Sequence, residues 1–345
     1  MGNKIKIHEI AKKIGVTSKE ALEKAKILGI EASSHLSGVS EEEAERIEKS
    51  FKGNSKPEEP KKHKEAKPKK EVKEELHGEF SANDLIKVRG TVQPFNDSQQ
   101  LRIERIRKVT EADGVRIEDF VPSAGFSGEA MFDELMKAAL SFKDSELKAL
   151  VTELLNEYKE KLLYWPAAFR LHHAIRGGLL YHTLSILRMA QGVADIYPFI
   201  DRDLLFAGVI LHDIAKTEEF DVAQTGIASG YTTDGNLVGH LVRGAMAVDR
   251  CGKKLGISEN TLMLVEHMII SHHGEPEFGA AVRPMFLEAE ILSSLDTLDA
   301  KIYEIEQACR AVEPGEFTPR QWALDNRKLY NHDRNHADFK AELIK

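Results

Sequence analysis

A buried helix that ends in an imidazole and a carboxylate is the feature that most constrains this fold. The stretch LLFAGVILHDIAKTEEF covers residues 204 to 220, and its first eight residues are all apolar or glycine. Such a run predicts a helix that is buried on every side. His212 and Asp213 follow it directly. A charged group in a dry core costs on the order of several kcal/mol unless it is paired or bound to a metal ion.

Helix-period patterns continue through most of the chain after Pro122. We therefore predict a mainly α protein whose C-terminal domain is all-helical. The patterns predict seven helices, at residues 129 to 142, 145 to 163, 178 to 196, 202 to 213, 236 to 255, 259 to 271 and 285 to 311.

Histidines and aspartates recur in or beside the apolar segments of this helical region. A single buried histidine is more often a satisfied core residue than a ligand. Several helices that each hide an unpaired imidazole or carboxylate would be costly, whereas a shared metal centre satisfies all of these groups. The residues concerned are His172, His173, His182, His212, Asp213, His240, His272, His273 and Asp296.

The ligand types narrow the metal and the reaction. Nitrogen and oxygen ligands without cysteine suit Mn²⁺, Fe²⁺, Co²⁺, Mg²⁺ or Zn²⁺ in a reactive site rather than a structural zinc. There are more ligands than one ion needs, and Asp213 could bridge two ions on the order of 3.5–4 Å apart. Two such ions activate water and stabilise charge on a phosphoryl oxygen. The sequence thus predicts a phosphohydrolase or phosphodiesterase.

The order of these residues resembles that of the HD-domain superfamily of metal-dependent phosphohydrolases. HDIAK at residues 212 to 216 has the superfamily's HDxxK form. The resemblance implies a first ion held by His182, His212, Asp213 and Asp296, and a second held by His240, His272 and His273, with Asp213 as the bridge. Asp299 is expected to support these ligands from behind them.

Other side chains near the motif are expected to contact the substrate. Lys216, three residues after Asp213, could bring a positive charge to the scissile phosphate. His172, His173 and Arg176 precede the segment GGLLYH, and we expect them to contact a substrate phosphate. Capping and packing in a short helix is the alternative role for these three residues. Trp165 and Trp322 are expected to pack in the core or between domains.

A basic hairpin is predicted before the helices. LIKVRGTVQPF and QLRIERIRKV read as two strands joined through Asn96, Asp97 and Ser98. A hairpin alone is marginally stable, so it must pack on something. Its positive charges are Arg89, Arg102, Arg105, Arg107 and Lys108.

A longer resemblance, over residues 84 to about 332, is to the YhaM family of 3′→5′ exoribonucleases. It rests on YPFIDRDLLFAGVILHDIAKTEEF, YTTDGNLVGHL, ISHHGEPEFGAAVRPMFLEAEILSSLDTLDAK and PGEFTPRQWALDNRKLY. The resemblance implies a Mn²⁺-dependent enzyme that acts on single-stranded RNA and releases nucleoside monophosphates. That family carries an OB-fold before its HD domain. This chain retains only what resembles the closing hairpin of that fold, residues 88 to 110.

The N-terminal stretch IHEIAKKIGVTSKEALEKAKILGIEASSHLSGVSEEEAERI resembles the N-terminal subdomain of bacterial translation initiation factor two. Its capping boxes, Thr17 to Glu20 and Ser40 to Glu43, open two short helices. The resemblance implies an accessory module that docks on the ribosome or RNA. The following stretch has few large aliphatic residues, which predicts disorder. Its interleaved lysines and glutamates favour a solvated spacer over an RNA-binding arm.

Composition bounds the remaining possibilities. The chain has 345 residues and a net charge of −8, so it is not a globally basic nucleic-acid binder. Two cysteines make no disulfide framework, and no apolar run reaches the roughly 20 residues of a membrane helix. We expect a cytoplasmic protein without membrane contact, and homo-oligomerisation stays open.

The predicted segments are an initiation-factor-like module at 1–51, a charged disordered linker at 52–80, a partial OB-like β region at 81–123, a helical connector at 124–165, the HD domain at 166–311, and a tail at 312–345 packed on that domain.

Two other functions remain compatible with the sequence. One is an HD phosphohydrolase that acts on nucleotides or a cyclic dinucleotide, although the GYP signature of the cyclic-di-GMP branch is absent. The other is a non-catalytic RNA- or ribosome-binding adaptor. The N-terminal module favours the adaptor, and the complete set of ligands opposes it.

Overall fold

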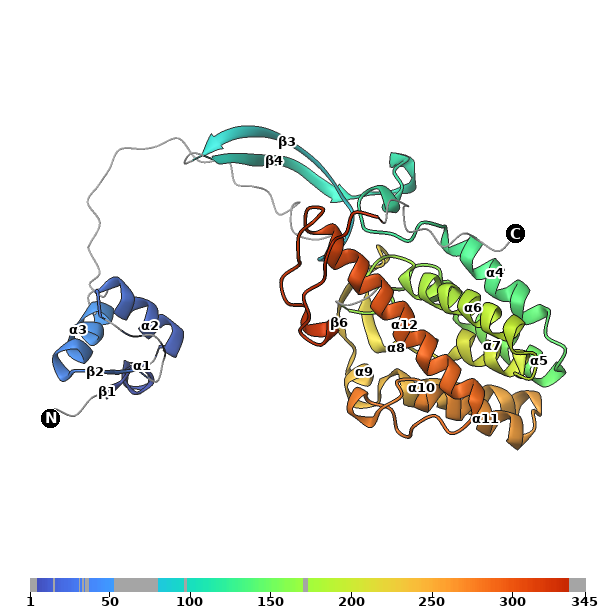
Figure 1. Ribbon diagram of the computed structural model, residues 1–345. Helices are drawn as coiled ribbons and strands as arrows, with labels where there is room; N and C mark the ends of the chain where they lie inside the picture. Colours follow the sequence, from blue (N-terminus) through green and yellow to red (C-terminus); the bar gives the residue numbers. More distant parts are fainter. Residues whose placement is uncertain are drawn as a thin grey trace. The chain divides into compact units, whose positions relative to one another are not determined.

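The chain divides into two compact units, residues 1–71 and 72–345 (Figure 1). A computed structural model describes residues 5–14, 16–30, 32, 34, 37–52, 80–95, 98–169 and 173–334. His172, the turn at Asn96 and Asp97, and the linker predicted at 52–80, except its two ends, lie outside these residues. Within the described ranges, every helix is too short or too polar to span a lipid bilayer.

The first unit is a small helical module. It contains β1 (Ile5–Lys6), α1 (Ile7–Ile14), α2 (Ser18–Ile27), β2 (Gly38–Val39) and α3 (Glu41–Lys52), with β1 and β2 antiparallel. Ile7, Ile10 and Ile47 are completely buried in its core. The capping box predicted before α3 is confirmed, because the Ser40 and Glu43 side chains each accept the other residue's backbone N–H.

The predicted basic hairpin is confirmed in the second unit. β3 (Ile86–Phe95) and β4 (Ser98–Lys108) are antiparallel, with a bulge at Arg89/Gly90. A side chain at Gly90 would clash with the Arg102 carbonyl group, so the bulge needs glycine. Within the described residues the two strands pair only with each other. At the base of the hairpin, Asp113 accepts hydrogen bonds of 2.7 Å from Lys87 and Arg107.

The seven predicted helices are confirmed, with small differences at their ends. They are α4 (Gly128–Leu140), α5 (Ser145–Leu162), α6 (Gly178–Ile196), α7 (Arg202–Leu211), α10 (Gly239–Leu255), α11 (Glu259–Ser271) and α12 (Leu287–Arg310). The structure adds the short helices α8 (Lys216–Glu219) and α9 (Thr233–Leu237) and a hairpin of β5 (Phe220–Val222) and β6 (Ala228–Tyr231). The added elements are too short to produce a periodic pattern.

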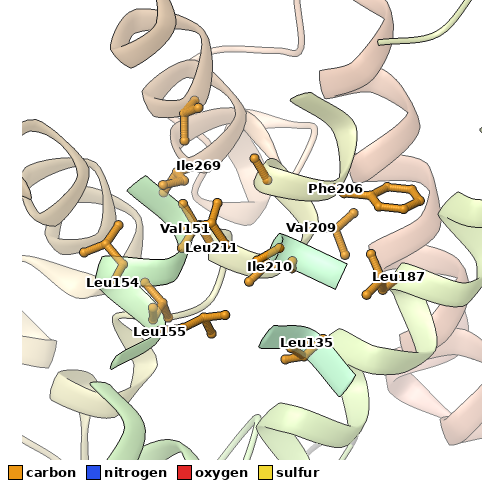
Figure 2. Packing of buried hydrophobic residues seen from close by; sticks show 14 of the residues in the cluster. Leu135, Val151, Leu154, Leu155, Leu187, Phe206, Val209, Ile210, Leu211 and Ile269 are labelled. Atoms are coloured by element: carbon orange, nitrogen blue, oxygen red, sulfur yellow. The ribbon is translucent and has the colours of Figure 1, made fainter. Parts of the chain in front are cut away.

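Helix α7 lies in the middle of the main core, as its composition predicts. All eight residues from Leu204 to Leu211 are buried, and Figure 2 shows side chains of α7 among those of α4, α5, α6 and α11. Each large aliphatic side chain buried here contributes roughly 1.5–3 kcal/mol. The end of the Met268 side chain from α11 fills the space beside Gly208, where a side chain on α7 would overlap it. The end of α7 is therefore held firmly in place.

The two tryptophans differ in their environments. Trp165 is buried, which confirms the packing that we expect for it. Trp322 is 73% exposed, so the same prediction for Trp322 is wrong. It lies in a short 3₁₀ turn after α12 in which only the neighbouring Leu324 is buried. Cys251 and Cys309 are both free thiols.

Candidate metal centre

The helix end at His212 brings two polar side chains into the core. Helix α7 ends at Leu211, His212 caps it, and Asp213 lies in the following turn. His212 is completely buried and Asp213 is nearly so. Lys216 begins α8 and is also buried, although a lysine at a helix end is ordinarily exposed. Three ionisable groups therefore lie together in the interior.

Asp213 is the centre of this cluster. Its Oδ1 lies 3.5 Å from Nε2 of His240 and 3.5 Å from Nε2 of His272. Its Oδ2 lies 3.3 Å from Nε2 of His212 and 3.7 Å from Nε2 of His182. Each carboxylate oxygen thus faces its own pair of imidazoles.

Five helices or helix ends supply these groups. His182 lies in α6, His212 caps α7, His240 is the second residue of α10, His272 caps α11 and Asp296 lies in α12. Helix α12 packs against α6, α7 and α11, which brings Asp296 to 3.1 Å from Nε2 of His182. Ligating atoms of His182, His212 and Asp213 lie within 4.8 Å of one another, as do those of His240, His272 and His273.

The far nitrogen of each ring is held by an acceptor. Carbonyl and carboxylate oxygens cannot donate, so Nδ1 carries the proton in every ring and the Nε2 lone pair is available in the neutral ring. This is the arrangement typical of metal-binding histidines. The five contacts are His182 to Asp299 at 2.7 Å, His212 to the Val209 carbonyl at 2.8 Å, His240 to Glu219 at 2.9 Å, His272 to the Ile269 carbonyl at 2.7 Å, and His273 to the Phe278 carbonyl at 2.9 Å.

Buried polar atoms point inward without hydrogen bonds. In the part of the chain that the structure describes, Nε2 of His212, His240 and His272 and Oδ1 of Asp213 are buried and make none. Unsatisfied buried groups are costly. A divalent ion between nitrogen and oxygen donors would satisfy all four atoms, so the residues present fit such an ion.

The protonation states of His272 and Asp213 agree with this arrangement. Burial lowers the pKa of His272 to about 3, so its ring is neutral at ordinary pH, as metal ligation requires. Although burial opposes ionisation of Asp213, Lys216 and His212 hold the pKa of its carboxyl group well below the usual range. Burial also disfavours a charged His182, yet hydrogen bonds to Asp296 and Asp299 raise its pKa to about 10. Without an ion this ring is therefore charged at ordinary pH, and an ion held at Nε2 would take the place of its second proton.

Asp296 and Asp299 lie on different sides of His182. Asp296 is near the Nε2 that faces Asp213, whereas Asp299 accepts from Nδ1. The same Oδ2 of Asp299 also lies 2.8 Å from Nε2 of His173. Asp299 therefore supports His182 from behind, where the sequence analysis expects it.

The expected phosphate contacts of His173 and Arg176 do not fit their positions. His173 is completely buried and faces Asp299, so solvent and substrate cannot reach it. The Arg176 guanidinium group lies 3.1 Å from Glu118 and donates to the Gln224 carbonyl at 2.7 Å. Both side chains make their contacts with other residues of the fold. Their positions are therefore more consistent with the alternative role, capping and packing.

Lys216 is held in place by contacts of both its side chain and its backbone carbonyl group. Its Nζ lies 2.6 Å from Oδ2 of Asp213, and its carbonyl group accepts a 2.8 Å hydrogen bond from Trp165 Nε1. Burial disfavours its charge, but Asp213 raises its pKa, so the ammonium group stays charged. A positive charge is thus held beside Asp213.

Glu219 is a buried side chain of the candidate site that the sequence does not reveal. It is buried and hydrogen-bonded to His240, yet in the sequence it is one of two adjacent glutamates, Glu218 and Glu219. The only signal is that a glutamate ends a short helix beside the buried strand residue Phe220. Nothing in the spacing alone separates Glu219 from Glu218.

Comparison with known proteins assigns the family. Residues 179–301 match the HD domain, and residues 2–53 match the translation initiation factor IF-2, N-terminal region. The 3'-5' exoribonuclease YhaM of Bacillus licheniformis is 37% identical over 251 residues, which is 73% of this chain and 79% of that protein. YhaM of Listeria monocytogenes is 36% identical over 261 residues, 76% of this chain and 82% of that protein. YhaM of Bacillus subtilis is 36% identical over 251 residues, with coverages of 73% and 79%.

No solved structure matches the chain. The HD domain implies divalent-metal binding, in agreement with the buried histidines and aspartates described above. The curated relatives are matched over most of their own length at more than one third identity. The chain therefore belongs to the YhaM family.

Proposed function

We propose that this chain is a metal-dependent 3′→5′ exoribonuclease that hydrolyses single-stranded RNA with two divalent ions. Membership of a family whose curated members are named 3'-5' exoribonucleases supports the reaction. One observation carries the two-ion site: Oδ1 and Oδ2 of Asp213 face separate pairs of imidazoles. A carboxylate placed in this way suits a bridge between two ions.

The proposed ligands form two groups around Asp213. The donor set favours Mn²⁺, with Fe²⁺, Co²⁺, Mg²⁺ and Zn²⁺ as alternatives. When bound, such ions supply a nucleophile from water at neutral pH and stabilise charge on phosphoryl oxygens. We assign His182, His212, Asp213 and Asp296 to the first ion, and Asp213, His240, His272 and His273 to the second.

The chain's own residues position and charge this site. Asp299 and Glu219 fix the orientations of His182 and His240 through Nδ1. The buried Lys216 ammonium group keeps a positive charge beside Asp213, where it can stabilise a substrate phosphate. Access is favoured from the side of Asp296 and His273, since both side chains are partly exposed.

We also infer that the N-terminal module docks on the ribosome or on RNA. The match to the initiation-factor region supports this role, and none of the proposed metal ligands lies in that module. Removal of residues 1–52 should leave hydrolysis of a short RNA oligomer intact and reduce co-sedimentation with ribosomes. Unchanged co-sedimentation would contradict the docking role alone.

The central test is Asp213→Asn, which keeps the side-chain shape and removes the charge. We expect it to lower the rate of hydrolysis of a 5′-labelled single-stranded RNA. The loss should exceed the roughly 10–100-fold that is typical when a residue that supports a metal ligand is replaced. Metal content, measured on the purified protein, should fall as well. Asp221→Asn is the matched control, because Asp221 is exposed in β5.

The product pattern separates this function from the alternatives. A wild-type ladder that shortens from the 3′ end, and is abolished by a chelator, supports the proposal. Hydrolysis of free nucleotides or a cyclic dinucleotide with no cleavage of RNA would replace it with the phosphohydrolase function. A protein without metal that stays inactive after Mn²⁺ is added would favour the adaptor.

A further inference from the structure

The hairpin of β3 and β4 has one apolar face and one basic face. Residues directly opposite each other in the register share a face. At the bulge, Glu104 of β4 has no residue directly opposite it in β3. The apolar face consists of Ile86, Val88, Val92, Leu101, Ile103 and Ile106, and the basic face carries Lys87, Arg89, Arg102, Arg105 and Arg107.

Large side chains of the apolar face are open to solvent. Val92 is 60% exposed, Leu101 49% and Ile103 43%. At the base of the hairpin, the exposed residues Val115 and Phe120 extend this surface. Together with Ile86 and Val88 they line a cavity of about 250 Å³, whose lining also includes Leu85, Val109 and the ion pair of Lys87 and Asp113. Its volume is smaller than the roughly 300–1,000 Å³ of a typical ligand pocket. It is the size of one or two side chains.

A surface of this kind needs a cover. A two-stranded hairpin is at best marginally stable unless its apolar face packs against something. The exposed apolar area here is on the order of 500 Å², which is at the upper end for a monomer. None of the hairpin's side chains joins either core within the described ranges.

The charges decide which partner fits. RNA phosphates would be attracted to the basic face, because the apolar face carries one charged side chain, Lys108, at its base. Lys108 is already paired with Asp84 at 2.9 Å. The surface that covers the apolar face must therefore itself be apolar. Any positive charges of the partner must lie on the side that faces away from this contact.

We propose that the apolar face binds the same face of a second copy of this chain. A twofold axis requires a self-complementary surface. If the two hairpins cross antiparallel, the tip of each lies over the base of the other, so Leu101 of one copy can enter the cavity beside Val115 and Phe120 of the second. Both basic faces then point outward, which keeps their like charges apart.

The area sets the strength of this contact. Two copies would bury on the order of 1,000 Å², near the lower limit for a specific interface. The dimer should therefore be weak and depend on protein concentration. It goes beyond the proposed nuclease function, since each copy carries a complete set of candidate ligands in its own HD domain.

The test is sedimentation velocity of the full chain over a range of concentrations. We expect a monomer–dimer equilibrium that Leu101→Glu shifts to monomer. Gln100→Glu is the matched control, since it introduces the same charge on the neighbouring residue of the opposite face and should leave the dimer intact. Circular dichroism and RNA hydrolysis by Leu101→Glu check that the chain is folded.

Cross-linking tests the antiparallel arrangement independently. A mixture of Leu101→Cys and Val115→Cys chains should form a disulfide-linked dimer under mild oxidation, and neither Gln100→Cys nor wild type should do so with Val115→Cys. A wild-type chain that stays monomeric, or a dimer that survives Leu101→Glu, overturns the proposal. So does loss of RNA binding by Leu101→Glu with no change in mass, which would make the face a nucleic-acid surface.

Discussion

Nδ1 of His240 lies 2.9 Å from Oε2 of Glu219, the residue that ends α8. The contact holds the ring so that Nε2 points toward Asp213. Glu219→Gln keeps the shape but removes the negative charge that fixes the ring. We expect metal affinity at the second proposed ion to fall by roughly 10–100-fold, measured by titration of Mn²⁺ against activity.

Glu218→Gln is the control for Glu219→Gln. Glu218 accepts a hydrogen bond from the Tyr158 hydroxyl group instead of a ring of the metal centre. Equal metal affinities in the two variants would show that Glu219 does not position His240.

Lys216 offers a test of charge without loss of packing. Lys216→Met keeps the length of the buried side chain and removes the ammonium group beside Asp213. If this charge stabilises the reacting phosphate, kcat should fall on the order of 100-fold while bound metal is retained. Lys216→Arg should recover part of the rate, and an unchanged kcat in Lys216→Met would exclude the role.

Two glycines in α6 should respond in opposite directions to alanine. A side chain at Gly178 would clash with the His173 carbonyl group, whereas one at Gly192 would meet no atom within 4 Å in the described part of the chain. Gly178→Ala should destabilise the fold by about 1–3 kcal/mol. Gly192→Ala should stabilise it by about 0.5–1 kcal/mol through helix propensity. Chemical denaturation of both variants gives the comparison. A Gly178→Ala variant as stable as the wild type would contradict the backbone clash, and a destabilised Gly192→Ala variant would contradict the open site.

His267 should make stability depend on pH. Its Nε2 accepts the Met285 backbone N–H at 3.0 Å, and burial lowers its pKa from 6.5. The unfolded chain therefore binds more protons than the folded chain as the pH falls below 6.5. The contribution of His267 is complete above that pH and is lost as the pH falls through the folded pKa. NMR titration of His267 should give a value below 6.5; a higher value would remove the effect.

The helices could be predicted because their signal is periodic and local, and the candidate ligands could be listed because they lie in or beside the same apolar segments. The apolar run from Leu204 to Leu211 marks a buried helix by itself, and the position of Asp213 directly after it requires a compensating partner. Seven helices follow from the same 3.6-residue period.

The supporting contacts could not be predicted because they depend on tertiary distances. His173 and Asp299 are separated by 126 residues, and only the packing of α12 on α6 brings them together. Their burial makes the substrate role expected for His173 physically unsuitable. The prediction for Trp322 failed for a different reason. Its size favours burial, but it lies in a short turn after the last long helix, where it is exposed.

The hydrogen bond from Trp165 to the Lys216 carbonyl group has a consequence for where the enzyme can be shortened. The HD match begins at residue 179, after Trp165, and Lys161 of α5 also donates to the Thr217 carbonyl group at 2.9 Å. A fragment that starts at the HD match would lack both donors to the start of α8, which directly follows the turn that carries Asp213. We therefore expect the smallest active fragment to begin before α5, so the part of the chain that matches the HD domain is shorter than the part that holds the site in place.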